Sequence, residues 1–97
     1  MPAMHLSLQI LPRVPDDKLY PTVDKVIEMI KASGFPHVIG PMGTTVEGEM
    51  DELFNLVKEA HRICLAEGAT RVGSVIKTDM KPGGLSLEEK IGKYRNG

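Results

Sequence analysis

The sequence contains little of what identifies a function at first sight. Its 97 residues include one cysteine, Cys64, and no tryptophan, and 12 Lys and Arg residues are balanced by 13 Asp and Glu residues. No basic block alternates with aromatic residues, so the sequence lacks the electrostatic pattern of a nucleic-acid-binding protein. Neither DNA nor RNA is therefore an expected partner.

Long apolar runs are also absent. No segment is long enough to span a membrane, and the first residues lack the apolar stretch of a signal peptide. A lone cysteine cannot form a disulfide within the chain. Together these features predict a cytoplasmic protein with no membrane partner.

Four segments alternate apolar and polar residues with a period near two, which is typical of strands. They comprise residues 4–11, 37–41, 44–49 and 71–79. Pro12 is expected to end the first strand, and "PMG" at 41–43 is expected to turn the second strand into the third as a hairpin.

Three other segments carry apolar residues at helical spacing. The first ends at Gly34, and the second starts near Asp51 and ends at Gly68. The third is short, over residues 86–94, and Ser86 and Glu89 in it have the spacing of a capping box.

This order of elements predicts an α+β fold of the ferredoxin-like βαββαβ type. In that fold two helices cover one face of a four-stranded antiparallel sheet, and here a short C-terminal helix follows. The length predicts one domain over residues 1–97. Because so small a chain leaves much apolar surface exposed, the uncovered face of the sheet is expected to drive self-association.

Counting alternate positions predicts which side chains lie on that uncovered face. The polar ones are Ser7, Gln9, Thr45, Glu47 and Lys77, and the apolar ones are Leu11, Ile39 and Val75. A face of this composition favours a homo-oligomer, which we expect to be a dimer of dimers.

One motif is more specific than the rest. The run "GPMGTTVEGE" at 40–49, the helix that follows it and "SVIKTD" at 74–79 resemble the thiamine-binding protein family over nearly the whole chain. The resemblance implies a ferredoxin-like subunit of a homotetramer that binds thiamine, or its hydroxymethylpyrimidine half, and catalyses no reaction. The chain departs from the pattern at Met80-Lys81, where we expect an arginine in relatives.

Thiamine joins an aminopyrimidine to a cationic ring, so its site needs hydrogen-bonding groups and a carboxylate over an apolar floor. Residues of the uncovered face supply such groups, with Gly48 allowing close approach, and the predicted ligand contacts are Glu47, Thr45, Ser7, Gln9, Lys77 and Gly48. Alternatively, Glu47 and Lys77 form only a structural ion pair at a subunit interface.

Two other classes of function remain open, a small ferredoxin-like enzyme and a regulatory or structural oligomer. The sequence shows no nucleophile beside a base and no phosphate-binding loop, so we expect no catalysis and prefer free thiamine to its diphosphate. The three histidines and Cys64 show no metal-ligand spacing, so neither a metal nor a cofactor is expected besides the bound ligand. The choice between storage, sensing and transfer stays open.

Overall fold

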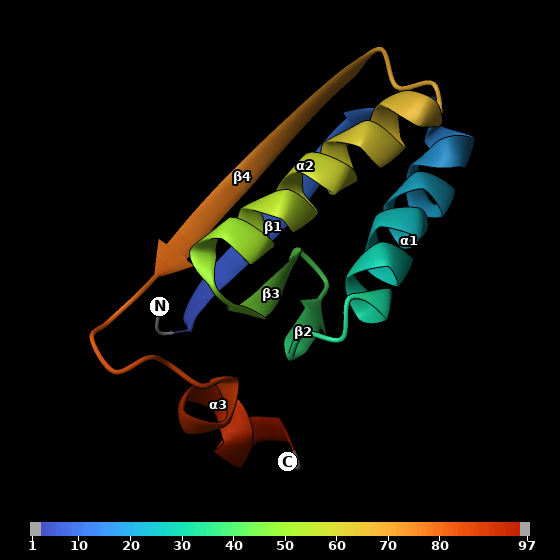
Figure 1. Cartoon of the computed structure of the whole chain (residues 1–97). Coiled ribbons are helices and arrows are strands. Elements are labelled where there is room, and N and C mark those ends of the chain that lie inside the picture. Colours follow the sequence, from blue (N-terminus) through green and yellow to red (C-terminus); the bar gives the residue numbers. More distant parts are fainter. Residues whose placement is uncertain (1–2, 96–97) are drawn as a thin grey trace.

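The computed structural model describes residues 3–95 (Figure 1). Its elements follow the chain as β1 Met4–Arg13, α1 Asp16–Ala32, β2 His37–Gly40, β3 Gly43–Gly48, α2 Met50–Ala66, β4 Arg71–Asp79 and α3 Leu87–Arg95. The strands form one antiparallel sheet in the order β2-β3-β1-β4. This arrangement confirms the α+β, ferredoxin-like fold expected from the order of elements.

Helices α1 and α2 lie side by side against one face of the sheet (Figure 1). The core between the helices and the sheet consists of alternate strand residues and one stripe from each helix. The strand period of two and the helical period of about 3.6 predicted this arrangement. It comprises Met4, Leu6, Leu8, Val26, Ile30, Val46, Leu53, Val57, Ala60 and Cys64. Burying each large side chain in such a core stabilises the fold by about 1.5–3 kcal/mol.

The prediction that Pro12 ends the first strand is wrong, because β1 continues to Arg13 and pairs with β4 along residues 5–13. Proline has no N–H to donate, so it fits a strand only where that N–H would have no partner. On its other side, β1 pairs with β3 only as far as Leu8 opposite Thr44. Pro12 therefore lies where β1 has a free edge.

The hairpin register corrects a second expectation, that Ile39 lies on the uncovered face. Ile39 pairs with Thr44, which is buried on the helix side at 5% exposure, whereas Val38 pairs with Thr45. Because paired residues point to the same side of a sheet, Val38 and not Ile39 joins the uncovered face. The register depends on the two-residue turn at Pro41 and Met42, which alternation within a strand does not specify.

Helix α3 lies beyond the end of the sheet where β1 begins and β4 ends (Figure 1). A turn containing Gly83 and Gly84, with φ of 88° and 91°, leads into it. The hydroxyl of Ser86 accepts a 3.1 Å hydrogen bond from the N–H of Glu89, so the helix has the expected N-terminal cap. Within residues 3–95, no helix has the length and apolarity needed to cross a membrane.

Candidate functional site

Three predicted site residues form one row across the uncovered face. Ser7 in β1 lies opposite Thr45 of β3 on one side and opposite Lys77 of β4 on the other. Side chains of directly opposed residues lie about 5 Å apart at Cβ, so these three can contact one small molecule. The row crosses the middle of the sheet because β1 is a central strand.

Helix α3 lines one side of a cavity of about 460 Å³ that includes this row. We call it the open-face cavity, and its lining residues are His5, Ser7, Val38, Thr45, Lys77, Thr78, Asp79, Leu87, Lys90 and Ile91. Its volume falls within the range of small-molecule sites, roughly 300–1,000 Å³. Val38, Leu87 and Ile91 supply apolar surface, while three hydroxyls, two lysines, His5 and Asp79 supply polar groups.

Glu47 joins β3 to both β1 and α3. Its Oε1 accepts hydrogen bonds from the backbone N–H of Leu87 at 2.7 Å and from Nε2 of His5 at 3.2 Å. Its side chain is only 18% exposed. Among residues 3–95 of one subunit, Glu47 and Lys77 form no ion pair, since Glu47 lies opposite His5 in the register while Lys77 lies opposite Ser7. Glu47 thus ties the start of α3 to the sheet.

His5 was not among the predicted site residues, yet it lines the open-face cavity and is only 3% exposed. Because the ionised carboxylate of Glu47 can only accept, Nε2 of His5 is the donor in their contact. Its Nδ1 is buried and has no hydrogen-bond partner among residues 3–95. One feature of the sequence could have indicated His5: it alternates along β1 in step with Ser7 and Gln9, and so lies on the same face.

The rim of the cavity carries an ion pair between Lys90 of α3 and Asp79 of β4, with Nζ and Oδ2 2.6 Å apart. The hydrogen bond and positive charge of Lys90 lower the pKa of Asp79 below its ordinary value of 3.8. This pair is a second link between α3 and the sheet. In the part of the chain that the structure describes, Lys77 forms no ion pair and its ammonium is free to meet a ligand.

The two remaining predicted residues do not line this cavity. Gln9 shares the uncovered face but lies one register step further along, opposite Val75. Gly48 lies against the helix layer, where an added Cβ would come within 3.1 Å of Leu53 and 3.4 Å of Phe35. The absence of a side chain at Gly48 therefore serves the packing of the core.

Chemically, the open-face cavity suits a small molecule with both polar and apolar groups. The hydroxyls of Ser7 and Thr45 both donate and accept hydrogen bonds, Lys77 donates, and Val38 and Ile91 offer apolar contact. Among residues 3–95, no three His, Cys, Asp or Glu side chains gather closely enough to hold a metal ion. The groups present can thus hold and orient a heterocycle.

Comparison with known proteins adds independent information. The UPF0045 protein CPE1503 of Clostridium perfringens (strain 13 / Type A) is 52% identical over 95 residues, which cover 98% of this chain and 100% of that protein. The UPF0045 protein YqgV of Bacillus subtilis (strain 168) is 32% identical over 71 residues, covering 71% of this chain and 68% of that protein. Both names leave the function open.

Solved structures of similar chains share the fold. A domain of unknown function from Bacillus cereus has a TM-score of 0.88 at 36% identity, covering 98% of this chain and 92% of that one. A Thermotoga maritima protein, provisionally named for thiamine biosynthesis or salvage, has a TM-score of 0.86 at 38% identity and covers 97% and 100%. The family model described as thiamine-binding protein matches residues 6–95, and this chain therefore belongs to the thiamine-binding protein family.

Proposed function

We propose that this protein binds thiamine or its hydroxymethylpyrimidine half, without catalysing a reaction, in the open-face cavity at an interface between subunits. The observation that carries the proposal is the row of Ser7, Thr45 and Lys77, which lines a cavity of about 460 Å³ together with α3. Family membership points to the same class of ligand.

The chemistry of the cavity supports an aminopyrimidine. The ring nitrogens and amino group of this heterocycle need both acceptors and donors, and the hydroxyls of Ser7 and Thr45 provide both. Val38 and Ile91 provide apolar contacts for the two ring faces. The cationic thiazolium would lie away from the ammonium groups of Lys77 and Lys90, because like charges repel.

A subunit interface is proposed because α3 closes only one end of the uncovered face. Further along it, Leu11 and Val75 remain 47% and 45% exposed. A second copy packed over this part of the sheet would bury them and close the cavity from the far side. The proposed assembly is a homotetramer built as a dimer of dimers.

Binding is preferred to catalysis because of where the acid-base groups lie. His5 with Glu47 is a histidine–carboxylate pair, yet His5 is almost fully buried and Glu47 is held by the start of α3. A general base must reach the proton it removes. This pair therefore supports the site's structure better than an enzymatic role.

A panel of three ligands tests the proposal: thiamine, hydroxymethylpyrimidine and thiamine diphosphate. A ligand that binds only the folded protein stabilises it by about 2.7 kcal/mol at a hundred times its Kd, so thiamine and the pyrimidine should raise the melting temperature. We expect the diphosphate to bind more weakly, because neither an arginine nor a glycine-rich loop lines the cavity and Lys90 is already paired with Asp79. An unchanged melting temperature with thiamine and the pyrimidine, at millimolar concentration, would refute the proposal.

A further inference from the structure

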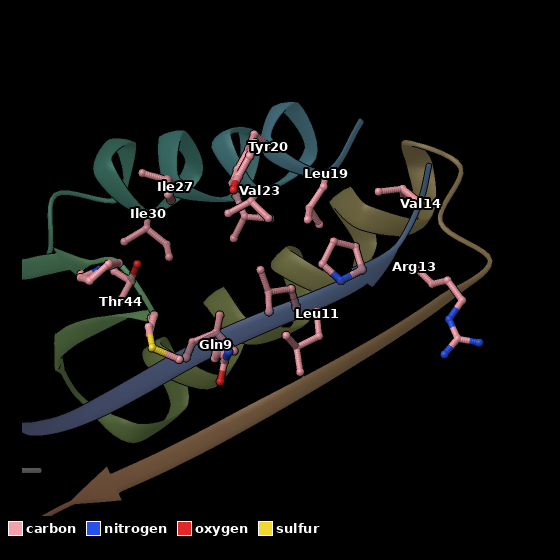
Figure 2. A pocket seen from close by; sticks show the side chains of 18 of the residues that line it. Gln9, Leu11, Arg13, Val14, Leu19, Tyr20, Val23, Ile27, Ile30 and Thr44 are labelled. Atoms are coloured by element: carbon pink, nitrogen blue, oxygen red, sulfur yellow. The ribbon is translucent and has the colours of Figure 1, made fainter. Parts of the chain in front are cut away.

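A second cavity lies on the helix side of the sheet, where β1 extends past β3. It measures about 520 Å³ and lies between α1, the far half of β1 and the turn from β2 to β3 (Figure 2). We call it the α1 groove. Its α1 wall includes Leu19, Tyr20, Val23 and Ile27, and Met42 of the turn lies at its other end.

The backbone of β1 has a free edge along this groove. Pairing between β1 and β3 stops at Leu8 opposite Thr44, although β1 continues to Arg13. In an antiparallel sheet, the N–H and C=O of one residue point to the same neighbouring strand, and successive residues alternate. For each residue beyond Leu8, the N–H and C=O therefore point either toward β4 or toward the groove.

Three observations agree on that direction. The C=O of Arg13 accepts from Thr70 and so points toward β4. The C=O of Leu8 points toward β3, because a Cβ on Gly43 would lie 3.3 Å from its oxygen. Position 12 is a proline, which has no N–H to donate to β4, so it fits a position that points away from β4. Since the register of β1 with β4 is uninterrupted from residue 5 to residue 13, Ile10 must point away from β4, like Leu8 and Pro12.

Ile10 therefore presents both an N–H and a C=O toward the α1 groove. No strand lies opposite it on that side, and neither group has a backbone partner in the turns and loops of residues 3–95. Backbone polar groups next to an apolar surface normally have a hydrogen-bond partner. The paired donor and acceptor of Ile10 are thus available to a ligand edge of matching pattern.

We propose that the α1 groove is a second ligand site, for a planar heteroaromatic molecule whose edge carries a ring nitrogen beside an amino group. The ring nitrogen accepts from the N–H of Ile10, and the amino group donates to its C=O. Tyr20 and Met42, each 76% exposed, cover the ring faces, and the aliphatic side chains of α1 form the floor. Aminopyrimidines and aminopurines have such an edge.

Pro12 favours this occupant over a peptide strand or the edge of a second copy. An added strand uses N–H groups at every second residue of the edge, here those of positions 10 and 12. Only Ile10 has one, because proline lacks it. One donor and one acceptor suffice for an amino-heterocycle but are too few for a stable β-ladder.

Adenine is the probe, and N6,N6-dimethyladenine is its matched control, because the two methyl groups remove both donors of the amino group. Two variants accompany the wild type. Ile10→Pro removes the N–H at a position where β4 does not need it, and Ile10→Val keeps the N–H while changing the side chain. Titrations of ¹⁵N-labelled protein followed by NMR give both the affinity and the location of binding.

We expect adenine to shift the amide signals of Ile10 and Met42, and Ile10→Val to bind it with unchanged affinity. Ile10→Pro and the dimethylated probe should each weaken binding by about tenfold, the scale of one lost hydrogen bond. If Ile10→Pro fails to fold, the two probes on the wild type decide the question. Equal affinity for both probes, or no shift around the groove, would overturn the proposal.

Two other outcomes separate this site from competing explanations. Groove signals that shift with protein concentration alone would show that a second copy occupies the groove, and this would also overturn the proposal. The inference does not rest on the proposed function, since binding at the open-face cavity is read from the signals of Ser7, Thr45 and Lys77. Failure at one site therefore leaves the other testable.

Discussion

The carboxylate of Glu47 holds the backbone N–H of Leu87 at 2.7 Å across forty positions of sequence, and so joins β3 to the first turn of α3. The same oxygen accepts from the almost fully buried His5. A carboxylate at a helix N-terminus stabilises the free N–H groups there. The wall of the open-face cavity therefore depends on one residue of the family-like motif.

Replacing Glu47 with glutamine should lower stability and leave most of the ligand affinity intact. Glutamine can still accept a hydrogen bond, but both contacts lose their charge, so we expect the free energy of unfolding to fall by about 1–2 kcal/mol. Urea denaturation measures the change. The control is Glu52→Gln, at an exposed position in the first turn of α2, and it should stay within about 0.5 kcal/mol.

This expectation reverses the role that the sequence suggested for Glu47. A direct ligand contact would instead produce weaker thiamine binding with an unchanged or raised melting temperature. If Glu47→Gln shows that combination, the carboxylate faces the ligand and α3 must be held mainly by other contacts.

Deleting residues 86–97 should remove one wall of the cavity. Leu87 is 5% exposed, and α3 lines the same cavity as His5, Ser7, Thr45 and Lys77. Isolated helices this short are marginal in water, so the nine residues of α3 owe their order to this docking. We expect the truncated protein to melt at a lower temperature or change its oligomeric state, and to bind thiamine more weakly. A truncated protein that melts, assembles and binds like the full chain would make α3 dispensable.

Acid should loosen α3 through the pair of Asp79 and Lys90. The pKa of Asp79 is lower in the folded protein, because Lys90 bonds to the carboxylate and attracts its charge. The folded state therefore binds this proton less readily than the unfolded state. The contribution of the pair is fully present above the ordinary value of 3.8 and is lost as the pH falls through the lowered pKa.

Hydrogen exchange of the amides of α3 measures this effect between pH 5 and pH 2. Protection should fall in the wild type below pH 3.8, and Asp79→Asn should already show reduced protection at pH 5. Asp24→Asn, on an exposed position of α1, is the control and should follow the wild type. Equal protection in Asp79→Asn and the wild type at pH 5 would show that the pair does not hold α3.

The uncovered part of the sheet predicts self-association. Leu11 and Val75 are about half exposed on this face, beyond the reach of α3. Native mass spectrometry at micromolar concentration should find a tetramer, and Val75→Lys should shift it toward smaller species by placing a buried charge in the interface. A monomeric wild type would remove the interface from the proposed site.

Alternation and helical spacing were enough to predict the fold and half of the candidate site. Ser7, Thr45 and Lys77 came from counting alternate residues, and the register brings all three together. The count works because one face of each strand is buried, so a shift of one residue would expose the core. His5 follows from the same count, because it lies on the same side of β1 as Ser7.

Contacts between distant elements could not be predicted in this way. The partner of Glu47 depends on where α3 docks, and a period within one strand contains no information about a helix forty residues later. Whether β1 could continue past Pro12 depended on where β3 ends, because a strand tolerates proline only at a free edge. Ile39 was misplaced because the register of a hairpin is determined by its turn.

The most direct test of the central claim is calorimetric titration of thiamine into the wild type, Thr45→Val and Thr70→Val. Thr45 lies opposite Ser7 and lines the cavity, whereas Thr70 precedes β4 and lies outside the cavity. Thr70→Val is therefore a matched control for Thr45→Val. We predict that the wild type and Thr70→Val bind thiamine alike, and that Thr45→Val binds about tenfold more weakly because it loses a hydrogen bond. Equal affinity in all three proteins, or no heat with the wild type, would contradict thiamine binding in the open-face cavity.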